Sequence, residues 1–308
     1  MAIDVLQSKI RKMKNPTMVG LDPTPALIPP ALLEAACAEK GQNPAGLAFA
    51  YERFCCDMLD ALKGVVPAVK VQSACFTALG HAGLAAMEAV LAYAQKLKYY
   101  VLLETMRADV GHIAELTAQT VFGGLKIGDE TFFPYPCDGL VVNGYLGSDG
   151  IRPFLPYLSG EKAKNLFVVV RSSNRSAPEV QDLLSGDRNI YTAMADLTLR
   201  WNGEELFGKC GYGEVGAVVG AASAQAVQQL RRRYDTLFFL VPGYGPQGGF
   251  VKYMSCAFDR LGHGAAITAS RAILGAWQQE GFPNDPQEAA CAAAEKLKKL
   301  IESYITVL

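Results

Sequence analysis

The sequence predicts an α/β protein of the (β/α)8 TIM-barrel class. Short β-rich runs recur eight times along the chain, and stretches with helical spacing lie between them. Most of these runs are continuously apolar, which is typical of strands buried on both faces of a parallel sheet. The first run ends in Gly-Leu-Asp-Pro and not in the glycine-rich turn of a dinucleotide-binding sheet, so a barrel is favoured over a doubly wound fold.

Each expected strand ends at a glycine, a proline or a polar residue, as strands do where the chain turns. In chain order the expected strands span residues 17–21, 65–71, 99–103, 139–142, 166–170, 215–219, 236–241 and 264–268. The expected helices between them include 47–62, 84–97, 113–121, 224–234 and 250–261.

Cap and loop signals agree with this order of elements. Ser223 stands where an N-cap belongs, and Gly262 follows the helix expected to end at Leu261. We expect one TIM-barrel domain over residues 1–308, with N-terminal and C-terminal helical extensions. Glycine and proline content predicts long loops at 122–138 and 202–213, and a proline-rich connection with a short helix at 23–43.

The composition indicates a cytoplasmic protein without a nucleic-acid or membrane partner. Half of the residues are hydrophobic and the net charge is −1, whereas polyanion-binding surfaces need a basic face. The run Arg231–Arg233 is expected to complement a helix dipole. The eight cysteines form no C-x-x-C pair, which fits buried thiols in a reducing compartment, and residues 1–16 lack the apolar core of a signal peptide.

Polar side chains gather where the expected strands end. In a barrel the carboxyl ends of all strands meet at one mouth, which is where active sites are built. The stretch 101–109 shows this most clearly, since the apolar run Val-Leu-Leu leads directly into charged residues. The candidates at the strand ends are Asp22, Lys70, Gln72, Glu104 through Asp109, Asn143, Ser172, Ser173, Gln247 and Arg271.

The loops after the last two strands predict a phosphate site. Residues 242–249 read Pro-Gly-Tyr-Gly-Pro-Gln-Gly-Gly, and Ser270–Arg271 follow the eighth strand. Barrels frequently bind phosphate between these two loops, where glycines let backbone N–H groups approach the oxygens. Gln247 and Arg271 can add side-chain contacts, and a guanidinium can bind phosphate with two hydrogen bonds.

Two further groups of residues each allow two interpretations. Asp22 and Lys70 could hydrogen-bond the vicinal hydroxyls of a sugar, or could form an ion pair that closes the mouth. Residues 172–174, Ser-Ser-Asn, could meet the edge of a heterocycle or cap the next helix. The three histidines show no metal-ligand spacing, so neither a metal nor a cofactor is expected.

Together these segments resemble the orotidine 5′-monophosphate decarboxylase family, in its longer bacterial type. They occur in the family's order and span residues from about 18 to 276. The matching segments are 20–23, 70–72, 171–174 with Gln181-Asp182, 216–220, 242–249 and 270–271.

The resemblance implies a homodimeric barrel, joined through its active-site face, that needs no cofactor or metal. Its substrate would contain a pyrimidine, a ribose and a phosphate, and would lose CO2 to give UMP in pyrimidine biosynthesis. By position, the resemblance implies that Glu104, Asp109 and Lys70 are catalytic. It assigns substrate binding to Asp22 and Lys70 at the ribose, Ser172 or Ser173 at the pyrimidine, Gln247 and Arg271 at the phosphate, and Asn143.

The chain departs from the family's pattern at the residues that carry the chemistry. The family's Asp-x-Lys-x-x-Asp motif, whose last Asp crosses the dimer, reads Glu-Thr-Met-Arg-Ala-Asp at 104–109. Met106 carries neither charge nor proton, and Arg107 is expected to point to the opposite face of the strand. Without its lysine partner, Glu104 should have a raised pKa or should pair with Lys70. Ile113 and Gly144 also replace residues that are usual in the family.

These departures leave three functions open. The first is a decarboxylase with Lys70 or Lys126 as the substitute acid. The second is a non-catalytic protein that binds a UMP-like nucleotide. The third is a barrel enzyme on another sugar phosphate, with Glu104 and Asp109 as acid and base. The residues that separate the three hypotheses are Glu104 and Met106.

Overall fold

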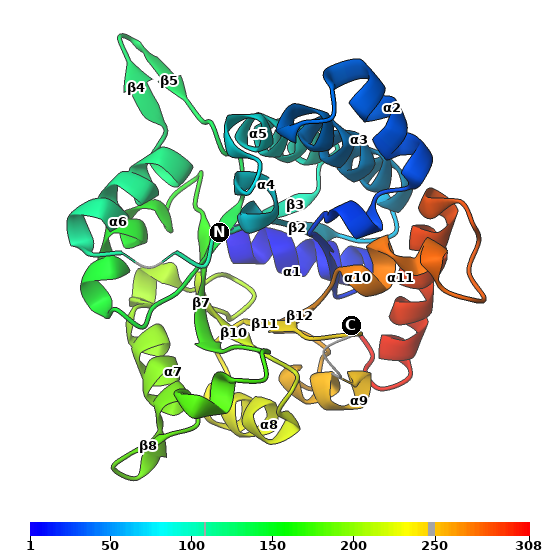
Figure 1. Ribbon diagram of the computed structural model, residues 1–308. Helices are drawn as coiled ribbons and strands as arrows, with labels where there is room; N and C mark the ends of the chain where they lie inside the picture. The colour runs from blue at the N-terminus through cyan, green and yellow to red at the C-terminus, as the bar shows by residue number, and fades with distance from the viewer. Residues whose placement is uncertain (108, 246–249) are drawn as a thin grey trace.

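Eight parallel strands close into a barrel in the computed structural model, which describes residues 1–107, 109–245 and 250–308 (Figure 1). The order around the barrel is β1-β12-β11-β10-β7-β6-β3-β2. The predicted (β/α)8 TIM barrel is therefore confirmed. Its strands are β1 (Thr17–Leu21), β2 (Ala68–Gln72), β3 (Tyr100–Glu104), β6 (Gly139–Val142), β7 (Asn165–Arg171), β10 (Val215–Val219), β11 (Phe239–Pro242) and β12 (Ala265–Ala269).

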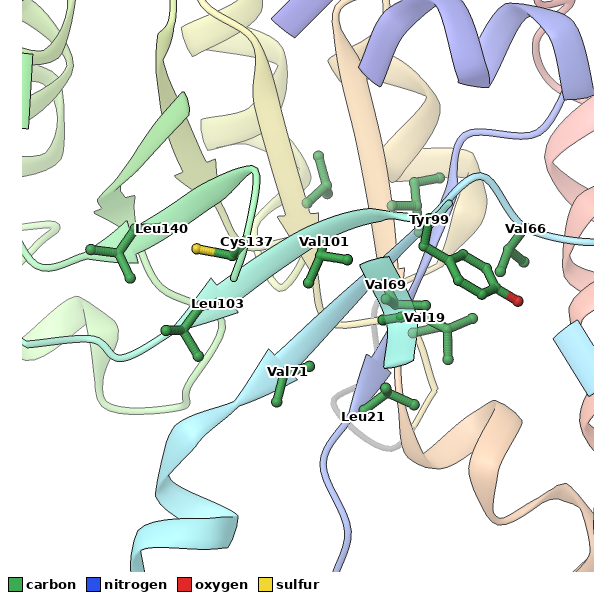
Figure 2. Close-up of a cluster of buried hydrophobic side chains, with 14 of the residues drawn as sticks. Val19, Leu21, Val66, Val69, Val71, Tyr99, Val101, Leu103, Cys137 and Leu140 are labelled. Carbon is green, nitrogen blue, oxygen red and sulfur yellow. The ribbon is translucent and has the colours of Figure 1, made fainter. Parts of the chain in front are cut away.

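Alternate residues of each strand face the surrounding helices. On β1 and β2, Val19, Leu21, Val69 and Val71 lie on this outer face, next to Val101 of β3 (Figure 2). All five side chains are fully buried. Because side chains alternate along a strand, the residues between them must face the inside of the barrel.

The inner residues fill the amino-terminal half of the barrel. Met18, Tyr100, Phe167 and Phe238 form one buried cluster with the apolar face of α1 (Ala2–Met13). The helix crosses the middle of the ring of strands in Figure 1. Since α1 and these side chains close one end of the barrel, a cavity can open only at the carboxyl ends of the strands.

The helices lie outside the barrel, and within the described residues none is both long and apolar enough to span a membrane. The side chain of Ser223 accepts a hydrogen bond from the backbone of Ala226, so the predicted N-cap is confirmed. The helices are α2 (Pro30–Lys40), α3 (Pro44–Leu62), α4 (Ser73–Thr77), α5 (Gly80–Lys96), α6 (Gly111–Ala118), α7 (Ile190–Arg200), α8 (Ala224–Arg233), α9 (Val251–Met254), α10 (Arg271–Leu274) and α11 (Pro286–Glu302).

The helix expected at 250–261 is much shorter than predicted. α9 ends at Met254 and continues only as one 3-10 turn, Ser255–Ala257. The carboxylate of Asp259 accepts hydrogen bonds from the backbone N–H groups of Leu261 and His263. Such local side-chain bonds compete with helical ones, so residues 259–263 turn instead of extending the helix.

The loop predicted at 122–138 contains a small hairpin that projects from the barrel (Figure 1). It pairs β4 (Leu125–Ile127) with β5 (Glu130–Phe132), and Gly128 supplies a left-handed residue at the turn. Strands of three residues are too short to show periodicity in the sequence. A second hairpin, β8 (Leu184–Ser185) with β9 (Arg188–Asn189), follows β7.

Arg231–Arg233 lie in the last turn of α8, where basic side chains complement the helix dipole as predicted, and Arg231 makes further contacts that the sequence did not predict. Its side chain is buried and donates hydrogen bonds to the carbonyls of Ala257, Tyr234 and Gly264. The guanidinium also lies 3.8 Å from the ring centroid of Phe239. Arg231 therefore ties the end of α8 to the last strands, while Arg232 and Arg233 stay on the surface.

Glu214 is a buried carboxyl group at the closed end of the barrel. It is fully buried and accepts hydrogen bonds from the backbone N–H of Ile3 at 3.0 and 3.1 Å and from Asn165. Burial raises the pKa of Glu214 to about 8, against the opposing effect of these bonds and of the terminal amine. The folded chain therefore holds a proton here at pH values where the unfolded chain has released it.

We expect the Glu214→Gln variant to gain stability relative to the natural chain as the pH rises. Between about pH 5 and pH 8 the folded state binds the extra proton, so this group lowers the free energy of unfolding by up to about 1.4 kcal/mol per pH unit. The contribution of Glu214 to stability is complete below the pKa that it has in the unfolded chain. It is lost as the pH rises through the pKa of about 8 that it has in the folded chain.

Urea unfolding at pH 5, 7 and 9 measures this effect. Glu88→Gln, on the exposed face of α5, is the matched control and should keep the natural pH dependence. An unchanged pH dependence in Glu214→Gln would show that this carboxyl titrates normally.

Candidate functional site

A polar cavity of about 290 Å³ opens at the carboxyl ends of the strands. Its residues continue the inner face of the barrel: Lys70 follows Ala68 by two positions, and Glu104 follows Leu102 by two. The predicted site residues that the structure brings together here are Asp22, Lys70, Gln72, Glu104, Ser172, Ser173 and Arg271.

Lys70 lies between two carboxylates at the centre of the mouth. Its Nζ atom is 2.9 Å from Oδ1 of Asp22 and also forms an ion pair with Oε2 of Glu104. Lys70 and Glu104 are only 6% and 8% exposed. Burial alone would lower the pKa of Lys70, but the charges of Asp22 and Glu104 outweigh it and raise that pKa above its usual value. The expected pairing of Glu104 with Lys70 is confirmed, as is the ion pair of Asp22 with Lys70.

Met106 lines the same cavity, just beyond the end of β3. Its backbone is left-handed, with φ of 51°, and its N–H donates to the carbonyl of Val141 at 3.2 Å. Arg107 is exposed and lies outside the cavity lining, as expected. The expected reason, alternation of side chains along a strand, does not apply, because β3 ends at Glu104. The left-handed backbone at Met106 instead turns the chain before Arg107.

Ser172 and Ser173 both line the mouth, but their hydroxyl groups differ. The Ser172 hydroxyl donates to Oδ1 of Asn174 at 2.5 Å and accepts from Gln181 at 2.9 Å. Ser173 makes no side-chain hydrogen bond within the described residues, which leaves its hydroxyl available to a ligand. The alternative that these residues cap a helix is wrong, because the next turn, Ala177–Glu179, begins after Ser176.

Arg271 begins α10 and faces the mouth from the side of β12. It is exposed and forms no ion pair with any described residue, so its guanidinium is open to an anion. Gln247, predicted beside it, lies outside the described residues. Asn174, expected with Ser172 and Ser173, also lines the cavity. The sequence analysis did not name Tyr244 or Thr268 as site residues, although Tyr244 lies in the predicted phosphate loop and Thr268 ends the eighth expected strand.

Asn143 and Asp109 do not line the cavity of this single chain. The side chain of Asn143 accepts a hydrogen bond from the backbone of Tyr145 and so stabilises a turn. The carboxylate of Asp109 accepts from the N–H of Val110 and is exposed. Lys126, suggested as a substitute acid, is exposed on the projecting β4 hairpin, away from the mouth (Figure 1).

Within residues 1–107, 109–245 and 250–308, no group of three or more His, Cys, Asp or Glu side chains could hold a metal ion. The polar groups that line the mouth are instead suited to an organic anion. Among the described residues they are one guanidinium, one ammonium, two carboxylates and neutral hydroxyl groups. The expectation that neither metal nor cofactor is needed stays a prediction.

Comparison with known proteins agrees with the geometry. A family model described as the orotidine 5′-phosphate decarboxylase / HUMPS family matches residues 16–281. An orotidine 5′-phosphate decarboxylase of Rhodopirellula baltica is 35% identical over 90% of this chain and 89% of its own length. One from Clostridium perfringens is 31% identical over 96% of each chain. The crystal structure of an orotidine-monophosphate-decarboxylase homologue from Toxoplasma gondii has a TM-score of 0.78 and 28% identity, covering 98% of this chain and 96% of its own.

Proposed function

The chain belongs to the orotidine 5′-phosphate decarboxylase / HUMPS family, and we propose that its mouth converts orotidine 5′-monophosphate to UMP and CO2 at a rate limited by Met106. This is a family of carbon–carbon lyases that serves pyrimidine biosynthesis. One observation carries the proposal. The Asp22–Lys70–Glu104 cluster shares one cavity with Ser173 and Arg271, so groups suited to ribose, base and phosphate converge on a single ligand.

Each part of the nucleotide has a partner in the mouth. Arg271 is the described guanidinium of the mouth and can bind the phosphate with two charged hydrogen bonds. The Asp22 carboxylate accepts hydrogen bonds from the ribose hydroxyls, and the Lys70 ammonium donates to them. Of the two serines, Ser173 meets the pyrimidine edge, because the Ser172 hydroxyl is already bonded within its own segment.

The reaction breaks the bond between C6 and the carboxylate, and its electron pair stays on C6. CO2 leaves, and the resulting carbanion takes a proton to give UMP. A cation near C6 stabilises this charge as it develops, and a proton donor completes the reaction. Lys70 can serve as the cation, but its two carboxylate partners raise its pKa and make it a reluctant proton donor. Met106 can do neither, so we expect slow turnover.

A non-catalytic nucleotide-binding protein is the second candidate, and Met106 is the observation that favours it. Such a protein needs Arg271, Asp22 and Ser173 but no proton donor. The third hypothesis, an acid–base pair of Glu104 and Asp109, has less support. Glu104 is ion-paired with Lys70, and Asp109 lies outside the mouth of the single chain.

We further propose that the protein works as a cytoplasmic homodimer. Val110, Ile113 and Leu116 are 49%, 38% and 55% exposed on and next to α6, directly after the Met106 segment. An apolar face beside the mouth is suited to a second copy of the chain, which would bring Asp109 towards the partner's cavity. The eight cysteines are all unpaired, which fits a reducing compartment.

Calorimetric titration with UMP tests the binding half of the proposal. We expect saturable heat and a rise in the unfolding temperature, because binding to the folded state stabilises it. Release of CO2 from orotidine 5′-monophosphate, measured on the same preparation, separates the two candidates. Binding without turnover above the uncatalysed background would favour the non-catalytic protein. The absence of both binding heat and a thermal shift at millimolar UMP would contradict both candidate functions.

A further inference from the structure

An ion pair between buried Arg171 and half-buried Asp182 joins the two ends of the segment that follows β7. Arg171, the last residue of β7, is 4% exposed. Its Nε atom donates to Oδ1 of Asp182 at 2.8 Å, and its Nη2 atom donates to Oδ2 at 2.9 Å. A guanidinium and a carboxylate joined by two parallel bonds fix both distance and orientation. Residues 172–182 are therefore a closed loop, whose ends the pair holds together.

A second contact lies directly inside the first. The Oε1 atom of Gln181 accepts from the backbone N–H of Ser172 at 2.8 Å, and its Nε2 atom donates to the Ser172 hydroxyl at 2.9 Å. Ser172 in turn donates to Asn174. These bonds use the polar groups of Ser172 within the loop. They leave Ser173, between Ser172 and Asn174, as the cavity-lining serine whose hydroxyl has no hydrogen-bond partner among the described residues.

The loop is also anchored on both sides. The carbonyl of Asp182 accepts from the side chain of Asn189 at 2.6 Å, and that of Gln181 accepts from the N–H of Tyr191 at 2.9 Å, at the start of α7. On the other side, Gly220 donates its N–H to the carbonyl of Arg171. A Cβ atom at Gly220 would lie 2.6 Å from the backbone of Ser173, so only glycine permits this approach.

We propose that the Arg171–Asp182 pair and the Gln181–Ser172 contact are positioning residues for base recognition. Arg171, Gln181 and Asp182 lie outside the cavity lining, so they act on the ligand only through the residues they hold. They hold Ser173 where the pyrimidine edge binds, while the phosphate and ribose contacts come from other strands, β1, β2 and β12. This inference rests on the proposed nucleotide site. We call the Arg171–Asp182 pair and the Gln181–Ser172 contact together the clasp. Weakening the clasp should lower the affinity for the base and leave the affinity for the sugar phosphate unchanged.

The test compares two ligands on Asp182→Asn. The change keeps the shape of the side chain but removes the charge that Arg171 pairs with. Titrated with UMP, the variant should bind at least about tenfold more weakly than the natural chain, as expected for the loss of roughly one charged hydrogen bond. Titrated with ribose 5-phosphate, it should bind within twofold of the natural chain. Gln181→Leu should show the same split.

Asp187→Asn is the matched control, because Asp187 is exposed in the turn of the β8–β9 hairpin that follows the loop and forms no ion pair with described residues. It should leave both affinities unchanged. The inference is overturned if Asp182→Asn binds UMP like the natural chain, or if it loses both ligands equally, as a merely destabilised fold would.

Hydrogen exchange of the amides of residues 172–183, measured without ligand, separates this inference from the proposed function. We expect faster exchange in Asp182→Asn than in the natural chain or in Asp187→Asn, and unchanged exchange would overturn the clasp itself. A natural chain that binds neither ligand would contradict the proposed function, and the role in base recognition with it. Faster exchange would then still support the clasp as the contact that orders the loop.

Discussion

The Met106→Lys variant should release CO2 from orotidine 5′-monophosphate at least about 10²-fold faster than the natural chain. A positioned general acid contributes roughly 10²- to 10⁴-fold, and one preorganised stabilising group roughly 10²- to 10³-fold. Met106 lines the mouth beyond Glu104, so a lysine at this position would place a second ammonium group there. The gain should appear in kcat, since the new charge acts on the carbanion more than on the bound substrate.

Met106→Leu is the control, because it changes the side chain without adding charge. It should leave turnover unchanged. Combining Met106→Lys with Glu104→Asp should raise the rate further, since the pair restores the family's motif at both positions. If neither lysine variant turns over faster than Met106→Leu, then the limit on the rate lies elsewhere, and the assignment of Met106 is wrong.

The Arg271→Gln variant should bind UMP roughly 30- to 1000-fold more weakly than the natural chain. Removing one partner of a charged hydrogen-bonded pair costs about 2–4 kcal/mol within the range known for such pairs, which corresponds to that loss. Arg271 forms no ion pair with described residues, so its guanidinium is free to hold the phosphate. Calorimetric titration measures the change.

Uridine, which lacks the phosphate, is the ligand control for this variant, and its affinity should stay the same. Arg232→Gln, on the exposed face of α8, is the protein control and should bind UMP normally. A parallel loss of uridine and UMP affinity would show that Arg271 supports the fold of the mouth and not the phosphate.

Much of the barrel was predictable because its strands are buried on both faces. Continuous apolar runs mark such strands, and all eight were found within a few residues of their observed bounds. The largest errors, of three residues each, are at the starts of β2 and β11. Val66 and Leu237 are as apolar as strand residues but lie before the paired segments of β2 and β11, where they pack in the core without belonging to a strand. Hydrophobicity reports burial, not hydrogen bonding.

The site was predictable as a set of residues but not as a set of contacts. Lys70 and Glu104 could be predicted because both lie at the ends of expected strands. In β2 and β3 Gln72 pairs with Glu104, which places Lys70, two residues before Gln72 on the same face, beside Glu104. The division of labour between Ser172 and Ser173 depends on Gln181, nine residues away, and no pattern in the sequence reports it. Asn143 was named for its place in the chain, but its side chain stabilises a local turn.

A crystal structure of the natural chain with UMP tests the central claim most directly. The account predicts the phosphate on Arg271, the ribose hydroxyls on Asp22 and Lys70, and the pyrimidine edge beside Ser173, with C6 facing Lys70 and the Met106 side chain. A nucleotide bound outside this mouth, or with its phosphate away from Arg271, would contradict it.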